Sequence, residues 1–372
     1  MISDKVNYLI IGAGLTGVTV ANVLHNKGYK VIVIDKRNHI GGNCYCENIE
    51  NINVHKYGAH IFHTNNNKVW DYVNSFVPFN NYTHQVIANY KGELYNLPFN
   101  MNTFVKMFGL HTPDEVLNKI NEECIIRPEY NNLEEWVLGN VGNTIYEKLI
   151  KHYTEKQWQK KCSELPTDII KRLPLRMTFN NNYFNDKYQG IPKNGYNELF
   201  KKMLDGIDVI LDTDYFDNRE FFNNIADKII YTGPIDKYFN YCFGKLDYRS
   251  LRFETEVVNT PNYQGCSVMN YTDETPYTRI IEHKHFDTLS DNDIYKITRS
   301  VITKEYPDSY IEGINEPYYP VHTKENIEMY NKYKELSDKE NKVLFIGRLA
   351  EYKYYDMDDT IENVLLKMNK ID

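Results

Sequence analysis

The chemistry open to this chain is first indicated by three glycines and an aspartate near its start. Gly12, Gly14 and Gly17 follow an apolar run at 6–11. In a turn from strand to helix, such glycines permit a tight bend, the approach of a pyrophosphate and close packing of the helix on the strand. Asp35 ends the next apolar run, where a carboxylate can accept hydrogen bonds from ribose hydroxyls. The spacing therefore predicts dinucleotide binding, although a glycine turn without a ligand is the alternative.

A second glycine pair narrows the kind of dinucleotide. Gly41, Gly42 and Asn43 lie just beyond the second predicted strand, where many flavoproteins bring backbone against the pyrophosphate from its other side. A simple turn would explain the pair on its own. Together with the first glycine turn, the pair favours FAD over NAD.

The elements that must position these residues recur along the chain. Apolar runs typical of nucleotide-domain strands return at 208–211, 228–231 and 342–347, far from the opening unit. We therefore expect an α/β fold whose FAD-binding, Rossmann-like domain is assembled from discontinuous segments. The segments assigned to it are 1–80, 190–240 and 335–372.

Two inserts are expected between these segments. Thr112 and Pro113 mark a helix start, and apolar residues spaced by three and four follow at 133–138, which predicts a helical domain over 99–170. Short alternating stretches near 267–271 and 277–283 predict antiparallel strands. The antiparallel-sheet domain is assigned residues 81–98, 171–189 and 241–334.

Size and charge limit the partners. The 372 residues exceed the usual size of one core, so two or three domains are expected. The net charge is -8, and the lysines and arginines are scattered rather than gathered in a stripe, which argues against a nucleic-acid partner.

No apolar run reaches the length of a membrane span, and the early first strand leaves no room for a signal peptide. We expect a cytoplasmic chain without a membrane span.

The cysteines and one histidine cluster do not predict a metal. The six cysteines lack the spacing of zinc ligands and are expected to be reduced thiols. His55, His60 and His63 lie within nine positions, but no nearby carboxylate or cysteine completes a ligand set. No metal site is therefore expected.

Longer motifs resemble one known family closely. They are HKYGAHIFHT at 55–64, YTEKQW at 153–158, IKRLPLR at 170–176 with NNYF at 181–184, and GRLAEYKYYDM at 347–357. Together they resemble the bacterial-type UDP-galactopyranose mutases. The resemblance runs nearly end to end and also takes in PYTR at 276–279 and EPYYP at 316–320.

The resemblance implies an isomerase in cell-surface glycan biosynthesis. Members interconvert UDP-galactopyranose and UDP-galactofuranose without net redox change, with N5 of reduced FAD as the nucleophile toward the anomeric carbon. The substrates implied are therefore the two UDP-galactose forms. A flavin reductant of unknown identity and a homodimer are further expectations from relatives.

The same resemblance assigns roles to residues. Arg172 and Arg279 match the arginines that bind the diphosphate, a task that suits forked and permanently charged guanidinium groups, and His63 is expected to affect the reactivity of the flavin. The substrate-binding set is Tyr153, Trp158, Arg172, Tyr183, Arg279, Tyr319 and Tyr354. The cofactor set adds His60, Arg348, Asp356 and Met357 to the glycines, Asp35 and Asn43. Gln159 departs from the family, which usually has glycine after this tryptophan, and a larger side chain could reshape the loop beside Trp158.

Two alternatives share the nucleotide-binding pattern. An amine-oxidase-type flavin oxidase would turn over an amine with oxygen, and the paired arginines argue against it. A non-enzymatic relative that lost its flavin, similar to the Rab GDP-dissociation inhibitors, is opposed by the intact glycine pair and C-terminal motif. No acid or base for ring opening is evident in the sequence.

Overall fold

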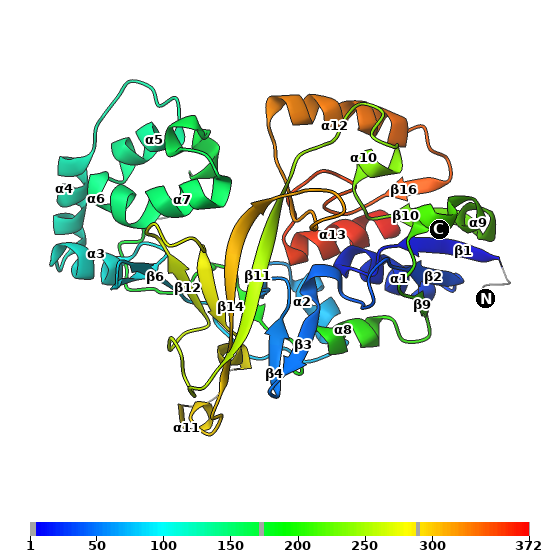
Figure 1. Ribbon diagram of the computed structural model, residues 1–372, viewed down its shortest axis with the longest axis horizontal. Helices are drawn as coiled ribbons and strands as arrows, with labels where there is room; N and C mark the ends of the chain where they lie inside the picture. The colour runs from blue at the N-terminus through cyan, green and yellow to red at the C-terminus, as the bar shows by residue number, and fades with distance from the viewer. Residues whose placement is uncertain (1–4, 171–174, 288–290, 372) are drawn as a thin grey trace.

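The computed structural model describes residues 5–170, 175–287 and 291–371. Figure 1 shows a group of helices at one end, a nucleotide-type α/β unit at the other, and long strands between them. The N- and C-terminal ends both lie on the α/β unit (Figure 1). The chain therefore leaves this unit and returns to it, as the discontinuous segments of the sequence predict.

The α/β unit is built on a five-stranded sheet in the order β16-β10-β1-β2-β9, in which all neighbouring strands pair in parallel. The strands are β1 (Val6–Ile11), β2 (Val31–Ile34), β9 (Asp208–Ile210), β10 (Ala226–Tyr231) and β16 (Val343–Phe345). The five apolar runs named in the sequence thus meet in one sheet, which confirms the predicted Rossmann-like arrangement.

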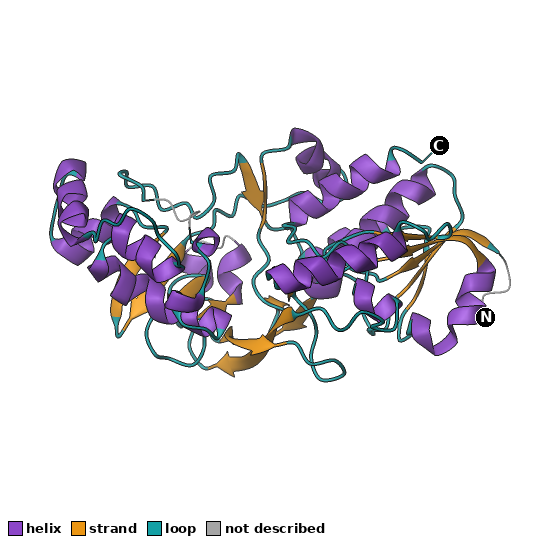
Figure 2. Ribbon diagram, turned by 90° about the horizontal axis from the view of Figure 1, so that it is seen from above, coloured by secondary structure: helices purple, strands orange, loops and turns teal. Residues whose placement is uncertain are grey.

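Both faces of this sheet are covered by helices. Ile10 and Val33 pack into one core, whereas their neighbours Leu9 and Ile32 pack into another, because successive side chains of a strand point to opposite faces. The covering helices are α1 (Leu15–Asn26), α8 (Tyr196–Met203) and α13 (Met357–Met368) on the first core, with η5 (Tyr215–Asn218), α9 (Arg219–Ile225) and α10 (Ile235–Tyr238) on the second. Figure 2 shows helices on both sides of the sheet.

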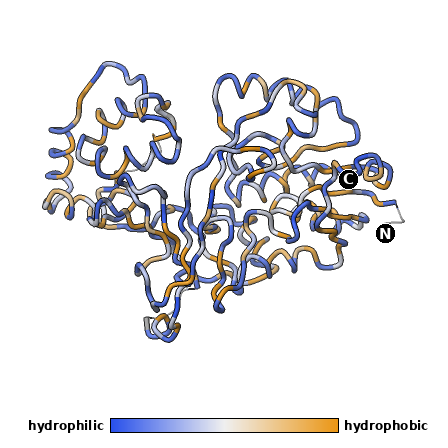
Figure 3. The backbone as a smooth tube through the Cα atoms, in the orientation of Figure 1, coloured by the Kyte–Doolittle hydropathy of each residue, from blue (hydrophilic) through white to orange (hydrophobic). Residues whose placement is uncertain are grey.

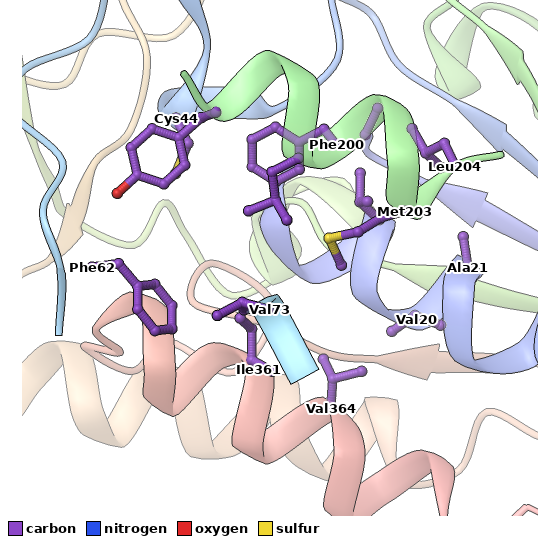
Figure 4. Close-up of a cluster of buried hydrophobic side chains, with 14 of the residues drawn as sticks. Val20, Ala21, Cys44, Phe62, Val73, Phe200, Met203, Leu204, Ile361 and Val364 are labelled. Carbon is purple, nitrogen blue, oxygen red and sulfur yellow. The ribbon is translucent and has the colours of Figure 1, made fainter. Parts of the chain in front are cut away.

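The first core joins helices that are distant in sequence. Figure 4 shows Val20 of α1, Phe200 and Met203 of α8, and Ile361 and Val364 of α13 in one cluster of buried side chains. These helices come from the start, the middle and the end of the chain. Their shared apolar contacts, each worth about 1.5 to 3 kcal/mol for a fully buried side chain, hold the three segments together.

A second sheet of seven strands separates the α/β unit from the helical group (Figure 1). Its order is β15-β11-β14-β13-β12-β6-β7. Its strands are β6 (Val86–Tyr90), β7 (Glu93–Leu97), β11 (Tyr248–Val258), β12 (Val268–Tyr271), β13 (Arg279–Glu282), β14 (Ser300–Ser309) and β15 (Tyr319–Pro320). All pairs are antiparallel except β6 with β12. The expected antiparallel sheet is therefore mixed, because β6 comes from a remote part of the chain rather than from a hairpin with β12.

The helical group packs around its own core. Its members are α3 (Met101–Phe108), α4 (Pro113–Glu123), α5 (Leu133–Asn140), α6 (Asn143–Ile145), the π-helical turn η2 (Tyr146–Ile150) and α7 (Lys151–Trp158). The predicted start of α4 is confirmed, since the Glu115 backbone N–H donates to Oγ1 of Thr112 at 3.4 Å and Pro113 follows the cap.

Smaller elements complete the described residues. They are η1 (Gly42–Cys44), β3 (Cys46–Ile49), β4 (Ile52–His55), β5 (Phe62–Thr64), α2 (Asn67–Asn74), η3 (Cys162–Glu164), η4 (Thr167–Ile169), β8 (Tyr188–Gly190), η6 (His283–Asp287), α11 (Asp291–Ile294) and α12 (Lys324–Ser337). Hydrophobic and hydrophilic stretches alternate along the whole tube in Figure 3. Among the residues that the structure describes, no helix has both the length and the apolar character to cross a bilayer.

Candidate functional site

The first glycine turn leaves no room for side chains. Gly12 has a φ of 108°, and a Cβ there would lie 2.1 Å from Oγ1 of Thr232, which itself donates to the Ile11 carbonyl at 2.8 Å. A Cβ on Gly17 would lie 1.8 Å from the Gly12 carbonyl oxygen. Both glycines are therefore required by the close approach of β1, α1 and the turn after β10.

The second glycine pair packs directly against the first turn. The Gly41 backbone N–H donates to the Ala13 carbonyl at 2.7 Å, and a Cβ on Gly42 would lie 2.8 Å from Cα of Gly14. Two stretches of bare backbone thus form one wall of a cavity of about 280 Å³. A dinucleotide pyrophosphate needs a stretch of backbone that no Cβ atom blocks. The glycines of this wall provide it, so the residues present fit a dinucleotide.

Asp35 joins the end of β2 to this turn. Its carboxylate oxygens accept from the backbone N–H groups of Ala13 at 2.6 Å and Arg37 at 2.8 Å. Each carboxylate oxygen keeps a further acceptor site, and Asp35 lines the cavity. The carboxylate can therefore accept from a ribose hydroxyl, at the carboxyl ends of the strands where open α/β sheets bind ligands.

A second cavity, of about 590 Å³, adjoins the first. His60, Arg348 and Met357 line both cavities, so the two share a wall. The second cavity lies between α7, the face of the seven-stranded sheet and the segment before α13. The predicted site residues that line it are His60, His63, Tyr153, Trp158, Tyr183, Arg279, Tyr319, Arg348, Tyr354, Asp356 and Met357.

The structure therefore brings most of the predicted site together. The residues of the first cavity are Gly12, Gly14, Asp35, Gly41, Gly42 and Asn43. Gly17 does not line the cavity; it lies against the Gly12 carbonyl and lets α1 pack close to the turn. Arg172 lies outside the described residues, so its predicted role stays a prediction.

Arg279 begins β13 and is held from two sides. Its Nη2 donates to the Tyr153 hydroxyl at 2.8 Å, and its Nε lies 3.2 Å from Oε1 of the buried Glu305. Burial alone disfavours the guanidinium charge, but the Glu305 carboxylate offsets this, so the pKa of Arg279 stands above its ordinary value. A permanent, oriented positive charge thus faces the cavity.

Arg249 of β11 is a second cavity arginine, which the sequence reasoning missed. Its guanidinium lies over the Trp158 ring, 4.7 Å from the centroid, and 5.8 Å from that of Tyr319. Among the described residues it has no ion-pair partner, and burial lowers its pKa. An arginine in an alternating strand carries no sequence signal that separates it from a surface residue.

Two tyrosines and Arg348 form a stack at the boundary of the two cavities. The rings of Tyr319 and Tyr354 are 5.3 Å apart at an interplanar angle of 19°. The Arg348 guanidinium lies 5.1 Å and 5.2 Å from their centroids. The stack joins the segment before α13 to β15 and places two hydroxyl-bearing rings and a cation in one wall.

The histidines of the cavity have defined partners. Nδ1 of His63 is 2.6 Å from Oδ2 of Asp186, and its ring stacks on Phe184 with 3.7 Å between centroids. His60 donates from Nδ1 to the Gly58 carbonyl at 2.8 Å, and burial lowers its pKa to about 4, so the ring is neutral near pH 7. His84, which the sequence reasoning did not select, also lines the cavity, and burial lowers its pKa to about 3.

Gln159 takes the backbone conformation that a glycine would supply. It ends α7 with a φ of 52°, in the left-handed region. Its Oε1 accepts from Oγ of Ser309 at 3.0 Å, and its Nε2 donates to the Pro307 carbonyl at 3.4 Å. The larger side chain therefore lies against the end of β14, outside the cavity that Trp158 lines.

The chain resembles known proteins over nearly all of its length. A family model described as UDP-galactopyranose mutase matches residues 148–354, and one described as an NAD(P)-binding Rossmann-like domain matches residues 10–76. A probable UDP-galactopyranose mutase of Klebsiella pneumoniae is 40% identical over 96% of this chain and 93% of its own length. A dTDP-fucopyranose mutase of Escherichia coli is 39% identical over 96% of both chains. A UDP-galactopyranose mutase of Mycoplasma genitalium is 35% identical over 96% of this chain and 93% of its own length.

Solved structures share the fold at lower identity. The crystal structure of a reduced UDP-galactopyranose mutase has a TM-score of 0.72 and 14% identity, covering 99% of this chain and 95% of that chain. A putative protoporphyrinogen oxidase from Exiguobacterium sp. 255-15 has a TM-score of 0.61 and 12% identity, covering 100% and 99%. At such identities these likenesses show the fold alone, and they confirm the expected α/β class.

Proposed function

Because the chain belongs to the UDP-galactopyranose mutase family, we propose that it interconverts UDP-galactopyranose and UDP-galactofuranose with reduced FAD. The observation that carries the proposal is the pair of adjoining cavities. One is a glycine-walled dinucleotide cradle, and the other is lined by three arginines, Arg249, Arg279 and Arg348, and by several aromatic rings. The arrangement suits a nucleotide sugar that lies with its sugar toward the cofactor.

The first cavity supplies the residues that would hold FAD. Gly14, Gly41 and Gly42 offer backbone to the pyrophosphate, and Asp35 offers its carboxylate to the ribose. Reduced FAD, when bound, supplies N5 as a nucleophile toward the anomeric carbon of the sugar. His60 and Met357, which line both cavities, would contact the cofactor where the two cavities join.

The arginines of the second cavity would hold the diphosphate while it is detached from the sugar. Departing UDP carries concentrated negative charge, and guanidinium groups bind phosphate oxygens with two parallel hydrogen bonds. Arg279 and Arg249 both line this cavity. Arg172 is proposed as a third on the resemblance, with the hydroxyls of Tyr183, Tyr319 and Tyr354 as further donors.

The aromatic side chains of α7 would hold the nucleoside. Tyr153 and Trp158 line the same cavity as the arginines. Flat rings can stack on a pyrimidine base, which orients the nucleotide without a charge. His63, which also lines this cavity, is proposed to act on the flavin.

The direct test measures the conversion of one UDP-galactose form into the other. Enzyme loaded with FAD and chemically reduced is incubated with UDP-galactofuranose, and the appearance of UDP-galactopyranose is measured by chromatography. Oxidised enzyme is the control and should form little product. Absence of product from fully reduced, FAD-loaded enzyme would overturn the proposal. Arg172→Ala is expected to lower the rate by about ten- to hundredfold, as for the loss of a charged hydrogen-bonding group.

A second candidate substrate is dTDP-fucopyranose. A relative named dTDP-fucopyranose mutase is almost as similar to this chain as the first UDP-galactopyranose mutase, 39% against 40% identity. The two sugar nucleotides differ at the sugar C6 hydroxyl, the base methyl group and the ribose 2′-hydroxyl. Competition between them in one reaction would give the ratio of kcat/KM values and assign the preference.

The oxidase alternative has weaker support. A putrescine oxidase structure has a TM-score of 0.57 and 12% identity to this chain. Measurement of oxygen consumption with candidate amines tests the oxidase alternative.

We also propose a homodimer in the cytoplasm that receives electrons from a separate reductant. Size-exclusion chromatography with light scattering tests the dimer.

A further inference from the structure

One lysine of α7 does not face the cavity that its neighbours line. Lys156 lies between Tyr153 and Trp158 in sequence, yet its ammonium group reaches the loop between β12 and β13. Nζ donates to the carbonyl oxygens of Tyr271 at 2.7 Å, Thr275 at 2.7 Å and Tyr277 at 3.0 Å. A lysine ammonium has three donors, and all three are used on one loop.

The loop is organised around this cation. Residues 272–278 connect β12 to β13. The carbonyls of Thr275 and Tyr277 in this loop, and of Tyr271 at the end of β12, all accept from Nζ. The carboxylate of Asp273 closes the other side of the loop, where it accepts from the backbone N–H groups of Lys91 at 3.0 Å and Thr275 at 3.0 Å. Without the ammonium, three partly buried carbonyl groups would lose a charged donor.

The same loop leads directly into an arginine that lines the second cavity. Arg279 begins β13, directly after the loop, and its Nη2 donates to the Tyr153 hydroxyl on α7. The helix and the hairpin therefore meet at two points, one turn apart on α7. Figure 1 shows α7 on the side of the helical group that faces β12 and β14.

We infer that Lys156 is a positioning residue that holds Tyr153 and Trp158 of α7 in register with Arg279, so that both ends of a nucleoside diphosphate are bound at once. The inference rests on the proposed function, since it concerns the same nucleotide site. Lys156 acts through the loop and the helix and does not touch the cavity.

The charge of Lys156, and with it the contact between α7 and the loop, depends on pH. Burial lowers the pKa of Lys156 to about 8, while Asp273 and Glu274 of the loop favour the charged form. Glu274 is itself 3.2 Å from Nζ of Lys91 and 3.7 Å from Nε2 of His152 on α7. The ammonium is charged below pH 8 and loses its proton above it, which removes one donor and the positive charge from the three carbonyls.

The first test compares UDP affinity by calorimetry in FAD-loaded protein. Lys156→Met keeps the length of the side chain and removes the charge, and we expect the Kd for UDP to rise about tenfold or more, as for lost charged hydrogen bonds. Lys151→Met is the matched control on the same helix. Lys151 pairs with Glu147 at 2.8 Å, and its variant should change the Kd by less than about twofold, as for an exposed pair.

The second test uses pH and does not depend on the methionine variant folding. UDP affinity of the unmodified protein should fall as the pH rises through about 8. In Lys156→Arg the guanidinium stays charged, so the fall should disappear while affinity at pH 7 stays within about threefold.

Two results would overturn the inference. One is a folded, FAD-loaded Lys156→Met protein that binds UDP as the unmodified protein does. The other is a Lys156→Arg protein that keeps the same fall above pH 8. Failure of the unmodified protein to bind UDP at any pH would instead contradict the proposed function, so the two failures are distinguishable.

Discussion

At the scale of single residues, Arg249 and Arg279 of the second cavity differ in what compensates their charge. Arg279 pairs with the buried Glu305, whereas Arg249 lies against aromatic faces. A buried carboxylate left without its partner is costly, so removal of the Arg279 charge would disturb folding as well as binding. Each arginine therefore needs its own substitution.

For Arg279, lysine is the informative replacement. Arg279→Lys keeps the positive charge beside Glu305 but loses the forked geometry that binds phosphate oxygens. We expect the thermal midpoint to stay close to that of the unmodified protein and the Kd for UDP to rise about tenfold. Arg252→Lys is the control, because Arg252 of the same sheet is exposed, pairs with Glu254 and lies over the Tyr306 ring, outside the cavity. Equal UDP affinity in Arg279→Lys and the control would remove Arg279 from the site.

For Arg249, glutamine is the better test. In Arg249→Gln the Glu305 carboxylate keeps its ion pair with Arg279, so stability should stay within about 1 kcal/mol. UDP binding should weaken by about ten- to hundredfold, since a charged hydrogen-bonding group is worth about 1.5 to 3 kcal/mol. Calorimetric titration with UDP and a thermal melt on the same sample separate the two effects. A stable variant with unchanged affinity would contradict the proposed role.

At the scale of elements, the segment between β14 and β15 lines part of the first cavity. Residues 310–318 carry Tyr310, Glu316 and Tyr318 into its lining. The Glu316 carboxylate lies 2.9 Å from Nζ of Lys36 and 3.4 Å from Nη2 of Arg37, both just after β2. A segment of the sheet insert is thereby tied to the nucleotide-binding unit by partly exposed ion pairs.

These ion pairs should slow the release of the cofactor. Glu316→Gln is expected to raise the FAD dissociation rate about two- to fivefold, in keeping with the modest strength of exposed pairs. Added salt should raise the rate of the unmodified protein toward that of the variant. Flavin fluorescence after dilution measures the FAD dissociation rate of the variant and of the unmodified protein with added salt.

A neighbouring glutamate provides the control for that experiment. Glu312 lies in the same segment but pairs with Lys245 at 2.8 Å and is not part of the cavity lining. Glu312→Gln should leave FAD release unchanged. If both variants release FAD at the unmodified rate, the segment does not retain the cofactor.

At the scale of the whole molecule, the nucleotide-binding unit is assembled from three stretches of chain. Strands β1, β10 and β16 are neighbours in the sheet but come from residues 6–11, 226–231 and 343–345. The first cavity is lined by residues at the end of β1 and β10 and by Arg348 and Leu349, which follow β16. A bound dinucleotide therefore contacts parts of the chain that nothing in the local sequence holds together.

FAD should accordingly stabilise the whole chain rather than one segment. At a free FAD concentration of 100 times Kd, binding adds about 2.7 kcal/mol to the free energy of unfolding. The thermal midpoint should rise by roughly 5 °C in a single transition that both far-ultraviolet and tryptophan signals follow. A midpoint that does not depend on FAD concentration would show that the cofactor does not bind the folded state preferentially.

Features that depend on local geometry can be predicted from the sequence alone. Gly12, Gly17 and Asp35 belong to one strand–turn–helix–strand unit at the start of the chain, so their spacing predicts the dinucleotide cradle, and the long motifs indicate the family. The start of α4 was also predictable, because Thr112 and Pro113 act within one helical turn. The proposed roles of Arg279, Tyr153 and Trp158 came from the resemblance and await their tests.

Features that depend on which remote segments meet can be read only from the folded chain. Arg249 belongs to the cavity only because β11 runs beneath Trp158, and the parallel pairing of β6 with β12 follows from where a distant strand enters the sheet. The three carbonyl contacts of Lys156 arise where a helix of one unit meets a hairpin of another. An isolated lysine or arginine has the same local pattern on a surface as in a site, so only the packing of the chain, which sets distance and burial, tells them apart.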